Sequence, residues 1–598
     1  MSWLTPGDSH ADLPTPRTRP GSCRVSASNL LQYAVFLAVV AALVKPLGGY
    51  MARVFEGQKT FLDPLLRPLE RLIYRLTGVE PELEMDWRRF SIAFILFSLI
   101  GALSLYAILR LQQFLPFFYA KYQNTPVSPD LAMNTAVSFA TTSTWQAYSG
   151  ESTMTYTSQM VGLMVQNFLA GASGLAVGVA FIRGLARQQT SKLGNFWVDM
   201  VRSLLWILLP LSLLGSLVLV WQGVPMNWHQ YVQATPLAGG QQVIPQGPVA
   251  ALEFIKNLGT NGGGFFNANA AHPYENPTPL SNFIELLAIV LLPAAFTNTF
   301  GRIIGKPRQG WMLFSVMVVL FVAGLLLCGW TERKGNASLA KDQSLSIRSL
   351  AGQPGGNMEG KEARFGIGGS VLAAVVTSNG ATGSTNSAHD SYTPLGGAVP
   401  LVNMLLGEII FGGLGTGIYS IIMLALVGLI LAGMMIGRMP EYLGKKIGPL
   451  ETKFITLYAL ATPLAILPFT ALAIATKAGL AGLATNTGPH GFTEIFYAYT
   501  SCFANNGQSF AGLNASTPFY NFSTAVVMML GRFALAIPAL ALAGHLAGQI
   551  TRQETENAVP TDKPLFAALL VATALIVGGL SFLPALTLGP ILEHLIGR

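Results

Sequence analysis

Charged residues are scarce in this sequence. They make up 11% of its 598 residues, whereas apolar residues make up 51%. A soluble domain carries about 25% charged residues, because most of its surface must face water. The composition therefore excludes a soluble globular fold, a disordered chain and a nucleic-acid binder, and it predicts an all-α polytopic membrane protein. The net charge of +8 (36 basic minus 28 acidic residues) then indicates basic loops on one side of a bilayer.

Cysteine is also rare. Cys23, Cys328 and Cys502 lie far apart, and the sequence has no CxxC motif and no Cys/His cluster. These spacings indicate neither a disulfide framework nor a cysteine metal site.

Motifs for ATP hydrolysis are missing. The sequence has no DKTG string for an aspartyl-phosphate and no GxxxxGK[ST] phosphate loop. The run GRIIGK at 301–306 has the wrong spacing and is followed by Pro307. We therefore expect that the chain does not hydrolyse ATP, and that any energy comes from a partner or an ion gradient.

Ten apolar runs reach the length of about 20 residues that a membrane span requires. They cover residues 30–51, 90–112, 157–182, 198–221, 280–301, 311–330, 398–437, 453–478, 518–547 and 564–586. The seventh run is interrupted by Gly412, Gly413, Gly415 and Gly417. Because glycine is costly inside a helix, this cluster predicts a broken helix that lines a cavity or is buried in protein.

The distribution of Lys and Arg predicts the orientation. The loops after the first, third, fifth, seventh and ninth runs are basic, which places them in the cytoplasm and both termini outside. Residues 1–29 contain four prolines and no apolar core of a signal peptide, so we expect a disordered tail.

Four polar segments interrupt the hydropathy pattern. They occupy 134–151, 251–269, 370–390 and 493–513, and each joins a half-length apolar helix to a Gly/Asn/Thr/Ser stretch before a full span. With Thr142, Gly262, Gly383 and Gly507 as register marks, the spacings are 120, 121 and 124 residues. So steady a period predicts four repeats of span, pore loop and span. The repeats would cover 90–182, 198–301, 311–437 and 453–547, with an extra span at 30–51 and another at 564–586.

The repeated loops suggest a chemistry. Each loop would dip into the membrane from outside and end in backbone without helical hydrogen bonds, which must be satisfied by other groups. Four such loops around a pseudo-fourfold axis could bind a dehydrated cation through rings of carbonyl oxygens, as in a potassium channel, although no loop contains TVGYG. The C-terminal ends of the half-helices also favour cations.

The strings SFATTSTWQAYSGE, NLGTNGGGFFNANAAHPYENPTPL, NSAHDSYTPLGG and FANNGQSFAGLNA resemble the four filter segments of the KdpA family, the potassium-translocating subunits of bacterial Kdp P-type ATPases. The resemblance runs from about residue 30 to the end. It implies that the chain binds potassium and passes it inward. The implied filter comprises Thr141, Thr142, Ser143, Thr144, Thr260, Asn261, Gly262, Gly263, Ala381, Thr382, Gly383, Ala504, Asn505, Asn506 and Gly507.

The same resemblance implies a complex in the bacterial inner membrane. The ATPase subunit KdpB would hydrolyse ATP, with KdpC and a small KdpF-like peptide attached, and potassium would be the only ion or cofactor that this chain binds. The sequence departs from the family pattern at Thr382, where many relatives carry cysteine, and in its N-terminal tail.

Ionisable residues inside apolar runs are candidate functional groups, because they are expensive in a membrane. Arg532 lies about 14 residues into the ninth run and Glu408 about ten residues into the seventh, directly before the glycine cluster. We expect the two to pair beneath the filter and, with Gly412, Gly413 and Gly415, to form a gate. Glu285, near the outer end of the fifth run, is expected to snorkel or cap a helix.

Other polar residues surround the loops. Glu151 and Glu275 are expected to add negative potential at the mouth. His389 and Asp390 follow the third loop, where local hydrogen bonding that braces the filter is the favoured interpretation.

Two alternatives stay open. One is a free-standing channel or cation symporter with the same four-repeat architecture and no ATPase partner. The other is an intramembrane hydrolase built around His389, although adjacent His and Asp do not make a triad and no GxSxG motif is present.

Overall fold

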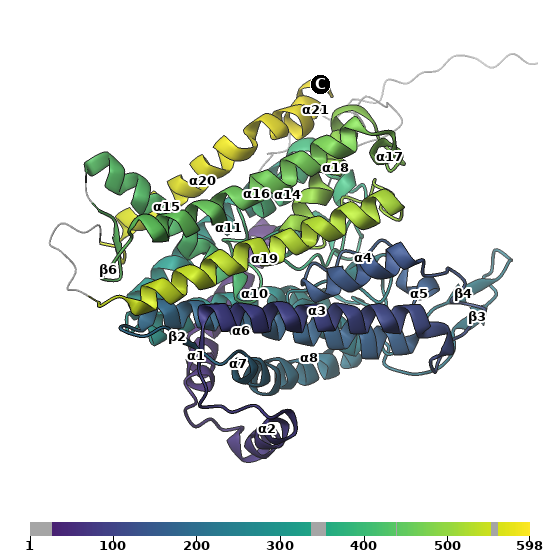
Figure 1. Cartoon of the computed structure of the whole chain (residues 1–598). Coiled ribbons are helices and arrows are strands. Elements are labelled where there is room, and N and C mark those ends of the chain that lie inside the picture. The colour runs from purple at the N-terminus through teal and green to yellow at the C-terminus, as the bar shows by residue number, and fades with distance from the viewer. Residues whose placement is uncertain (1–26, 336–354, 438, 552–559, 598) are drawn as a thin grey trace, which may run out of the picture.

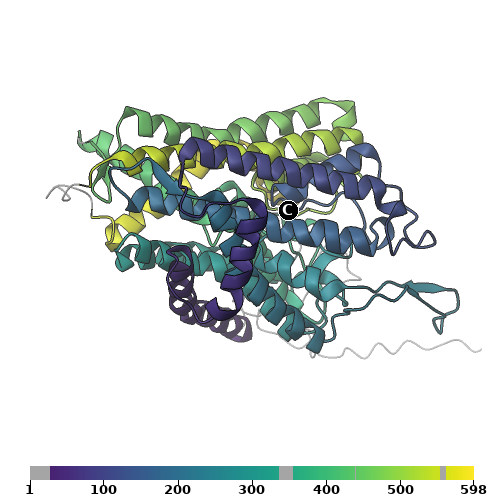
Figure 2. The ribbon, with the colours of Figure 1, turned by 60° about the horizontal axis from the view of Figure 1, so that its bottom comes forward.

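The computed structural model describes residues 27–335, 355–437, 439–551 and 560–597. The regular secondary structure of this part of the chain is almost entirely helical, as Figures 1 and 2 show. Its strands form three antiparallel two-stranded ribbons: β1 (Met85–Asp86) with β2 (Lys192–Gly194), β3 (Val232–Ala234) with β4 (Gln242–Ile244), and β5 (Glu441–Tyr442) with β6 (Lys445–Lys446).

Within the described residues, ten helical stretches are long and apolar enough to cross a membrane, which confirms the predicted number. They are α1 (Ala27–Phe55), α3 (Trp87–Leu111), η2 (Ser158–Met164) with α6 (Val165–Ala186), α7 (Phe196–Arg202) with η3 (Ser203–Leu208) and α8 (Leu209–Trp221), α10 (Pro279–Ile303), α11 (Pro307–Lys334), α15 (Thr416–Ile436), α16 (Pro449–Ala475), α19 (Pro518–Gly548), and α20 (Pro564–Leu586) with η6 (Thr587–Ile591) and α21 (Leu592–Ile596).

Four shorter helices occupy the positions predicted for half-helices: α4 (Pro129–Ala140), α9 (Val249–Leu258), α13 (Gly366–Asn379) and α18 (Gly488–Phe503). Each packs against the long helix before it and the helix after it in the chain. The remaining short elements are α2 (Asp63–Thr77), η1 (Gln112–Phe114), α5 (Gly150–Thr153), η4 (Asn269–Ala271), η5 (His389–Ser391), α14 (Pro394–Leu405) and α17 (Lys477–Leu480).

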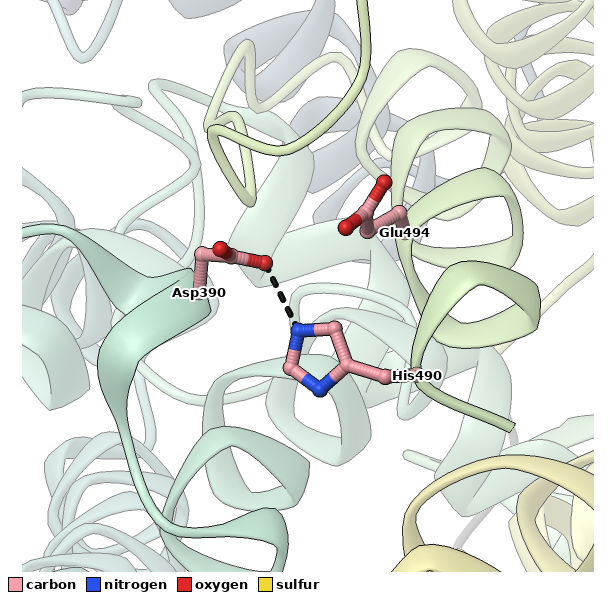
Figure 3. Close-up of side chains that lie close together, drawn as sticks. All are labelled: Asp390, His490 and Glu494. Atoms are coloured by element: carbon pink, nitrogen blue, oxygen red, sulfur yellow. Dashed lines mark hydrogen bonds and ion pairs between the residues drawn. The ribbon is translucent and has the colours of Figure 1, made fainter. Parts of the chain in front are cut away.

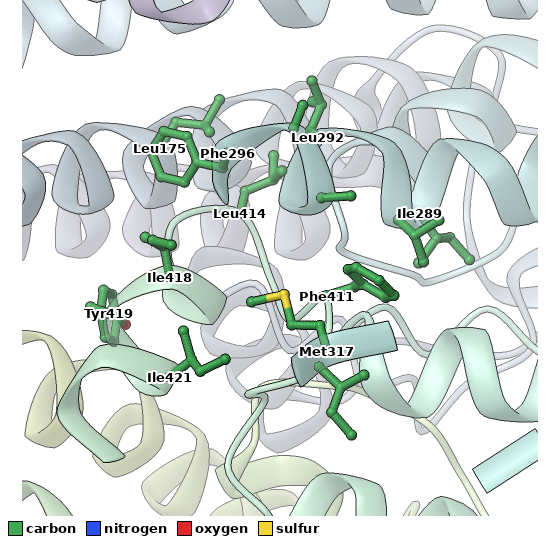
Figure 4. Packing of buried hydrophobic residues seen from close by; sticks show 14 of the residues in the cluster. Leu175, Ile289, Leu292, Phe296, Met317, Phe411, Leu414, Ile418, Tyr419 and Ile421 are labelled. Atoms are coloured by element: carbon green, nitrogen blue, oxygen red, sulfur yellow. The ribbon is translucent and has the colours of Figure 1, made fainter. Parts of the chain in front are cut away.

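The seventh apolar run is broken, as the glycine cluster predicts. It divides into α14 and α15, and residues 406–415 between them are not helical. This irregular backbone is buried: in Figure 4, Phe411 and Leu414 lie among side chains of α6, α10 and α11. Burial within protein is the condition under which irregular backbone persists at membrane depth.

The structure differs from the sequence predictions at two places in the N-terminal region: the start of the first helix and the basic loop that follows it. Residues 27–29 belong to α1 and not to a tail, while residues 1–26 lie outside the described part. The basic loop after α1 contains the helix α2, whose Leu66 and Tyr74 are buried while Arg67, Arg71 and Arg75 are on another face. Hydropathy alone missed α2, because the helix is amphipathic and too short to span a membrane.

Candidate functional site

The four half-helices end in the same way. In each, the first residue after the helix donates its N–H to the carbonyl four residues earlier, as in an unbroken helix. These bonds are Thr141 to Val137 (3.0 Å), Gly259 to Ile255 (2.7 Å), Gly380 to Val376 (2.8 Å) and Ala504 to Thr500 (2.9 Å). The chain then leaves the helical path, so the last carbonyls of all four helices face their polar loops without continuing helical partners.

The loops share a backbone conformation that side-chain patterns do not reveal. Each contains a pair of positive-φ residues separated by one residue, and in the second loop Gly263 also has a positive φ (79°). The pairs are Thr142 and Thr144, Thr260 and Gly262, Ala381 and Gly383, and Asn505 and Gly507. A positive φ in a threonine costs energy and persists only where the surroundings enforce it. The repeated pattern is therefore a strong structural sign that the four loops do the same thing.

This conformation corrects the register of the first loop. The sequence marks aligned Thr142 with Gly262, Gly383 and Gly507, but the second positive-φ position of the first loop is Thr144. The spacings become 118, 121 and 124 residues. Because no glycine marks the position in the first loop, residue identity pointed to the wrong threonine.

The four loops touch one another in a closed ring. A Cβ atom added to Gly262 would lie 1.7 Å from the carbonyl oxygen of Thr382, and one added to Gly383 would lie 2.4 Å from that of Asn506. At Gly507 the corresponding distance to the Ser143 oxygen is 1.9 Å. The ring is closed between the first two loops, where the Thr144 hydroxyl donates to the carbonyl of Asn261.

All fifteen expected filter residues lie in these loops, and all except the half-buried Gly507 are buried. Side chains hold the loops to each other. The Asn505 amide donates to the Ser143 hydroxyl (2.7 Å), and the Asn506 amide donates to the Thr377 carbonyl on the third half-helix (3.0 Å).

Two cavities of very different size flank the ring. The vestibule, of about 690 Å³, is lined by Thr144, Gly263, Gly383 and Gly507 together with loop residues such as Asn267 and Ser509. The inner cavity, of about 10 Å³, is lined on the other side by Thr142, Thr260, Ala381 and Asn505. The inner cavity has room for roughly one water-sized particle. The ring thus separates a wide opening from a nearly closed space.

Arg532 and Glu408 both line the inner cavity. Arg532 donates to the Thr142 hydroxyl (3.1 Å), the Ser173 hydroxyl (2.8 Å) and the Ala170 carbonyl (3.2 Å). Among the described residues it makes no ion pair of 4.0 Å or less with Glu408, so the expected direct pairing is wrong. Depth along a helix gives the height of a side chain but not the direction in which it points, and Arg532 points to the first loop and α6.

The broken segment passes directly beneath the ring. The Leu414 N–H donates to the Thr260 hydroxyl of the second loop (3.0 Å). Gly415 lies against α6, where an added Cβ would be 1.9 Å from the Gly174 carbonyl oxygen. Gly412 and Gly413 are buried beside Glu408, which itself has a positive φ of 59°. The segment is therefore anchored both to a filter loop and to α6.

A buried charge cluster behind the second loop was missed by sequence reasoning. Lys256 is fully buried, and its amino group contacts Glu253 (2.5 Å), Glu275 (3.3 Å) and the side-chain amide oxygen of Asn269 (2.7 Å). The Lys256 backbone carbonyl also accepts the N–H groups of Asn261 and Gly262. One residue thus connects the cluster to the loop. A short apolar helix with Glu and Lys three residues apart gives no sequence signal that both face inward.

Two expectations for acidic residues are wrong. Glu275 is completely buried and accepts the N–H groups of Phe265 (2.5 Å) and Phe266 (3.1 Å), so it braces the second loop instead of charging the mouth. Glu285 is 1% exposed and does not snorkel. Glu151 is partly exposed and accepts the N–H of Asn267, on the rim of the vestibule.

His389 is buried, and its Nδ1 lies 3.3 Å from the Tyr497 hydroxyl, which in turn donates to Gln508 behind the fourth loop (2.5 Å). The nearby Ser387 hydroxyl bonds with Tyr392. The arrangement is local bracing, and in the described residues no serine hydroxyl bonds with His389 as a hydrolase nucleophile would.

Comparisons with known proteins show the family of this chain. Residues 34–595 match the family model "KdpA: Potassium-transporting ATPase A subunit". A potassium-transporting ATPase potassium-binding subunit of Methylobacterium nodulans is 53% identical over 566 residues, which cover 95% of this chain and 97% of that one. The corresponding subunit of Granulibacter bethesdensis is 50% identical over 574 residues, covering 96% of this chain and 99% of that one.

Among solved structures, the potassium transporter TrkH of Vibrio parahaemolyticus matches with a TM-score of 0.49 and 14% identity, over 85% of this chain and 97% of that one. The family match extends over nearly the whole chain, and the ten apolar helices make it a multi-pass membrane protein. The chain belongs to the KdpA family, the A subunits of potassium-transporting ATPases.

Proposed function

We propose that this chain binds potassium from the extracytoplasmic side in the ring of four loops and passes it inward, as the ion-translocating subunit of an ATP-driven uptake complex. The observation that carries the proposal is the closed ring of loops with the same pair of positive-φ residues. Alternation of left- and right-handed backbone turns successive carbonyl oxygens to one side, and rings of such oxygens replace the hydration shell of potassium.

In this proposal the filter is formed by the fifteen loop residues at 141–144, 260–263, 381–383 and 504–507. They belong to four repeats at 90–182, 198–301, 311–437 and 453–547, and the extra helices at each end complete the ten spans. The vestibule supplies hydrated ions to the outer side of the ring. The ends of the four half-helices add a negative electrostatic potential that favours a cation over an anion.

The inner cavity is the position of the gate. Arg532 is a fixed positive charge next to Thr142 of the first loop, where it opposes the passage of a cation that has crossed the ring. Glu408 and the glycines Gly412, Gly413 and Gly415 form the segment that closes the path below. Since this segment is held by Thr260 as well as α6, a shift of the segment and a change in the filter are mechanically linked.

ATP hydrolysis falls to a partner subunit, in keeping with the family to which the chain belongs. In the finer form of the proposal, that partner is a KdpB-type ATPase accompanied by KdpC and a small KdpF-like peptide. The complex lies in the bacterial inner membrane with both termini of this chain outside, because the loops after alternate spans are basic. A free-standing channel is the competing function.

The test is potassium-stimulated ATP hydrolysis by the co-purified complex, with wild type compared to Gly262→Asp. A carboxylate cannot fit where a Cβ already meets the Thr382 carbonyl, so we expect potassium affinity to fall by more than about 10-fold and rubidium or sodium to be admitted. Gly305→Asp is the matched control, because Gly305 also has a positive φ (71°) but has no atom within 4 Å of an added Cβ.

Equal stimulation of both variants would refute the filter assignment. If the chain purifies without an ATPase and conducts potassium in liposomes, the channel function replaces the pump.

A further inference from the structure

A cluster of three carboxylates and one imidazole lies apart from the ring, and neither the filter nor the gate uses it. Asp390 follows the third loop, His490 and Glu494 are in the first turns of α18, and Glu593 is in the C-terminal α21. Three segments that are more than 90 residues apart in sequence meet here. Figure 3 shows Asp390, His490 and Glu494 converging from two of them.

The imidazole of His490 is fixed by both nitrogens. Nε2 lies 2.8 Å from Asp390 Oδ1, and Nδ1 lies 2.8 Å from Glu593 Oε1. Proteins orient a histidine metal ligand by a carboxylate on one imidazole nitrogen, as Glu593 holds Nδ1 here, so that the other nitrogen, here Nε2 beside Asp390, is directed at the metal. One ligand atom from each of Asp390, His490 and Glu494 lies within 4.8 Å of the others.

Glu494 supplies an independent sign that a ligand is missing. Its side chain is 0% exposed, and the Asn486 amide donates to Oε1 (2.8 Å), but Oε2 has no hydrogen-bond partner. A buried carboxylate oxygen without a partner costs free energy that a metal ion would recover. The orphaned oxygen belongs to the same residue that completes the three-ligand group.

The charges of the cluster do not balance. Three carboxylates surround one imidazole, and the adjoining cavity of about 230 Å³ adds Glu359 to its lining. Among the described residues that line this cavity there is no lysine or arginine. Even with His490 protonated, the cluster carries an excess of negative charge that a divalent cation would neutralise.

We propose that Asp390, His490 and Glu494 bind a divalent transition-metal ion of the zinc type, with Glu593 orienting the imidazole. Imidazole nitrogen and carboxylate oxygen bind zinc at about 2.0–2.2 Å, so tetrahedral ligand atoms lie roughly 3.3 Å apart. The present spacing of 4.8 Å or less requires shifts of about 1 Å in these side chains, of which Asp390 and His490 line the cavity. Zinc replaces the proton between His490 Nε2 and Asp390, and water completes the coordination.

The site would clamp three parts of the outer surface together. Asp390 lies in the segment that returns from the third loop, and α18 is the half-helix that leads into the fourth loop. A metal bound between them fixes the distance between two adjacent loops of the ring, while Glu593 ties the C-terminal helix to the same point. This role is structural and independent of whether the ring selects potassium.

The experiment uses the full chain with its co-purifying subunits, isolated through a tag without histidine and dialysed against EDTA. Titration calorimetry with ZnCl₂ should give one site per chain, and Co²⁺ should produce the visible absorption bands of a four-coordinate ion. Asp390→Asn and Glu494→Gln keep the side-chain shapes and should weaken zinc by at least about 10-fold. His229→Gln, at an exposed histidine outside the cluster, should leave binding unchanged.

X-ray absorption of the zinc-loaded wild-type protein gives a second measurement that needs no variant. It should show one nitrogen and two or three oxygen neighbours at about 2.0–2.2 Å. The proposal fails if the EDTA-treated wild type binds no zinc, if both cluster variants bind as tightly as His229→Gln, or if sulfur neighbours appear.

Discussion

The first and second loops reach the same backbone conformation with different residues. The second loop places Gly262 at the second positive-φ position, where a Cβ would collide with Thr382. The first loop places Thr144 there, and its hydroxyl reaches the Asn261 carbonyl. A glycine permits the conformation, whereas a threonine must be held in it by its neighbours. The comparison shows that the ring is imposed by its surroundings as much as by its glycines.

The two loops are also supported by buried cations from different directions. Lys256 lies behind the second loop among Glu253 and Glu275, and its own carbonyl accepts two loop N–H groups. Arg532 lies below the first loop and donates to the Thr142 hydroxyl. One cation is neutralised by carboxylates and acts on the backbone, while the other lacks such a pair and faces the inner cavity. We expect the first to matter for the integrity of the filter and the second for leakage.

The largest effect is expected from Lys256→Met. The change leaves Glu253 and Glu275 buried without their counter-charge, and removal of one partner from a buried pair costs about 3–5 kcal/mol. The melting temperature of the purified complex should fall and potassium stimulation of ATP hydrolysis should be lost. Both are measured on the same preparation.

Lys477→Met provides the control for Lys256→Met, since Lys477 is exposed. If both variants have the melting temperature of the wild type, the buried cluster does not stabilise the second loop. The proposed difference in how the first and second loops are supported is then wrong.

Arg532→Gln should change flux more than stability. Glutamine keeps hydrogen bonds to the first loop and α6 but removes the charge from the inner cavity, so potassium should leak through the complex in liposomes without ATP. Arg88→Gln, at an exposed arginine, should not leak. Unchanged flux and selectivity, even after charge reversal at Arg532, would remove this residue from the gate.

Thr144→Gly tests the comparison most directly, because it gives the first loop the residue of the other three. It removes one hydrogen bond, worth about 0.5–1.5 kcal/mol, so potassium affinity should change by less than about 10-fold. Thr144→Ser, which retains the hydroxyl, should change it less. An effect as large as that of Gly262→Asp would mean that the threonine, not the enclosing structure, shapes the loop.

The smallest effect concerns pH at the outer side of the second loop. Burial lowers the pKa of His272, whose ring stacks on Phe266 with centroids 3.9 Å apart. As the pH falls, His272 is therefore protonated in the unfolded chain before it is protonated in the folded chain. Its contribution to the free energy of unfolding is fully present above pH 6.5 and decreases as the pH falls below that value. His272→Asn should flatten the fall in melting temperature below pH 6.5. If the wild type and His272→Asn have the same dependence of melting temperature on pH, the acid sensitivity comes from another residue.

Much of the fold could be predicted from the sequence, because each membrane helix appears in the sequence as a long apolar run. The ten spans, the half-helices before the polar loops and the break at Gly412–Gly415 all appear in the structure. The helix α2 does not follow from hydropathy, since only one of its faces is buried. The spans, the half-helices and the break depend on local composition, which a sequence shows without knowledge of neighbours, whereas the burial of one face of α2 depends on the residues packed against it.

The details of the site depend on neighbours and were less predictable. The register of the first loop is set by backbone angles that threonine does not reveal. Lys256 and Glu285 are ordinary helix residues until the surrounding helices are placed. The separation of Arg532 from Glu408 depends on the rotation of α19, whereas the sequence fixes only the depth of each residue.

The contrast between the vestibule and the inner cavity has a thermodynamic consequence. If the ring binds the ion as proposed, that ion would exchange with the compartment beyond the wide vestibule, and the nearly closed inner cavity would separate it from the opposite compartment. Occupancy in this conformation is therefore an equilibrium with one compartment only. Under this proposal, the chain would respond to the concentration on that side and would not dissipate a gradient at rest. Work is then required at one place, the opening of the inner cavity.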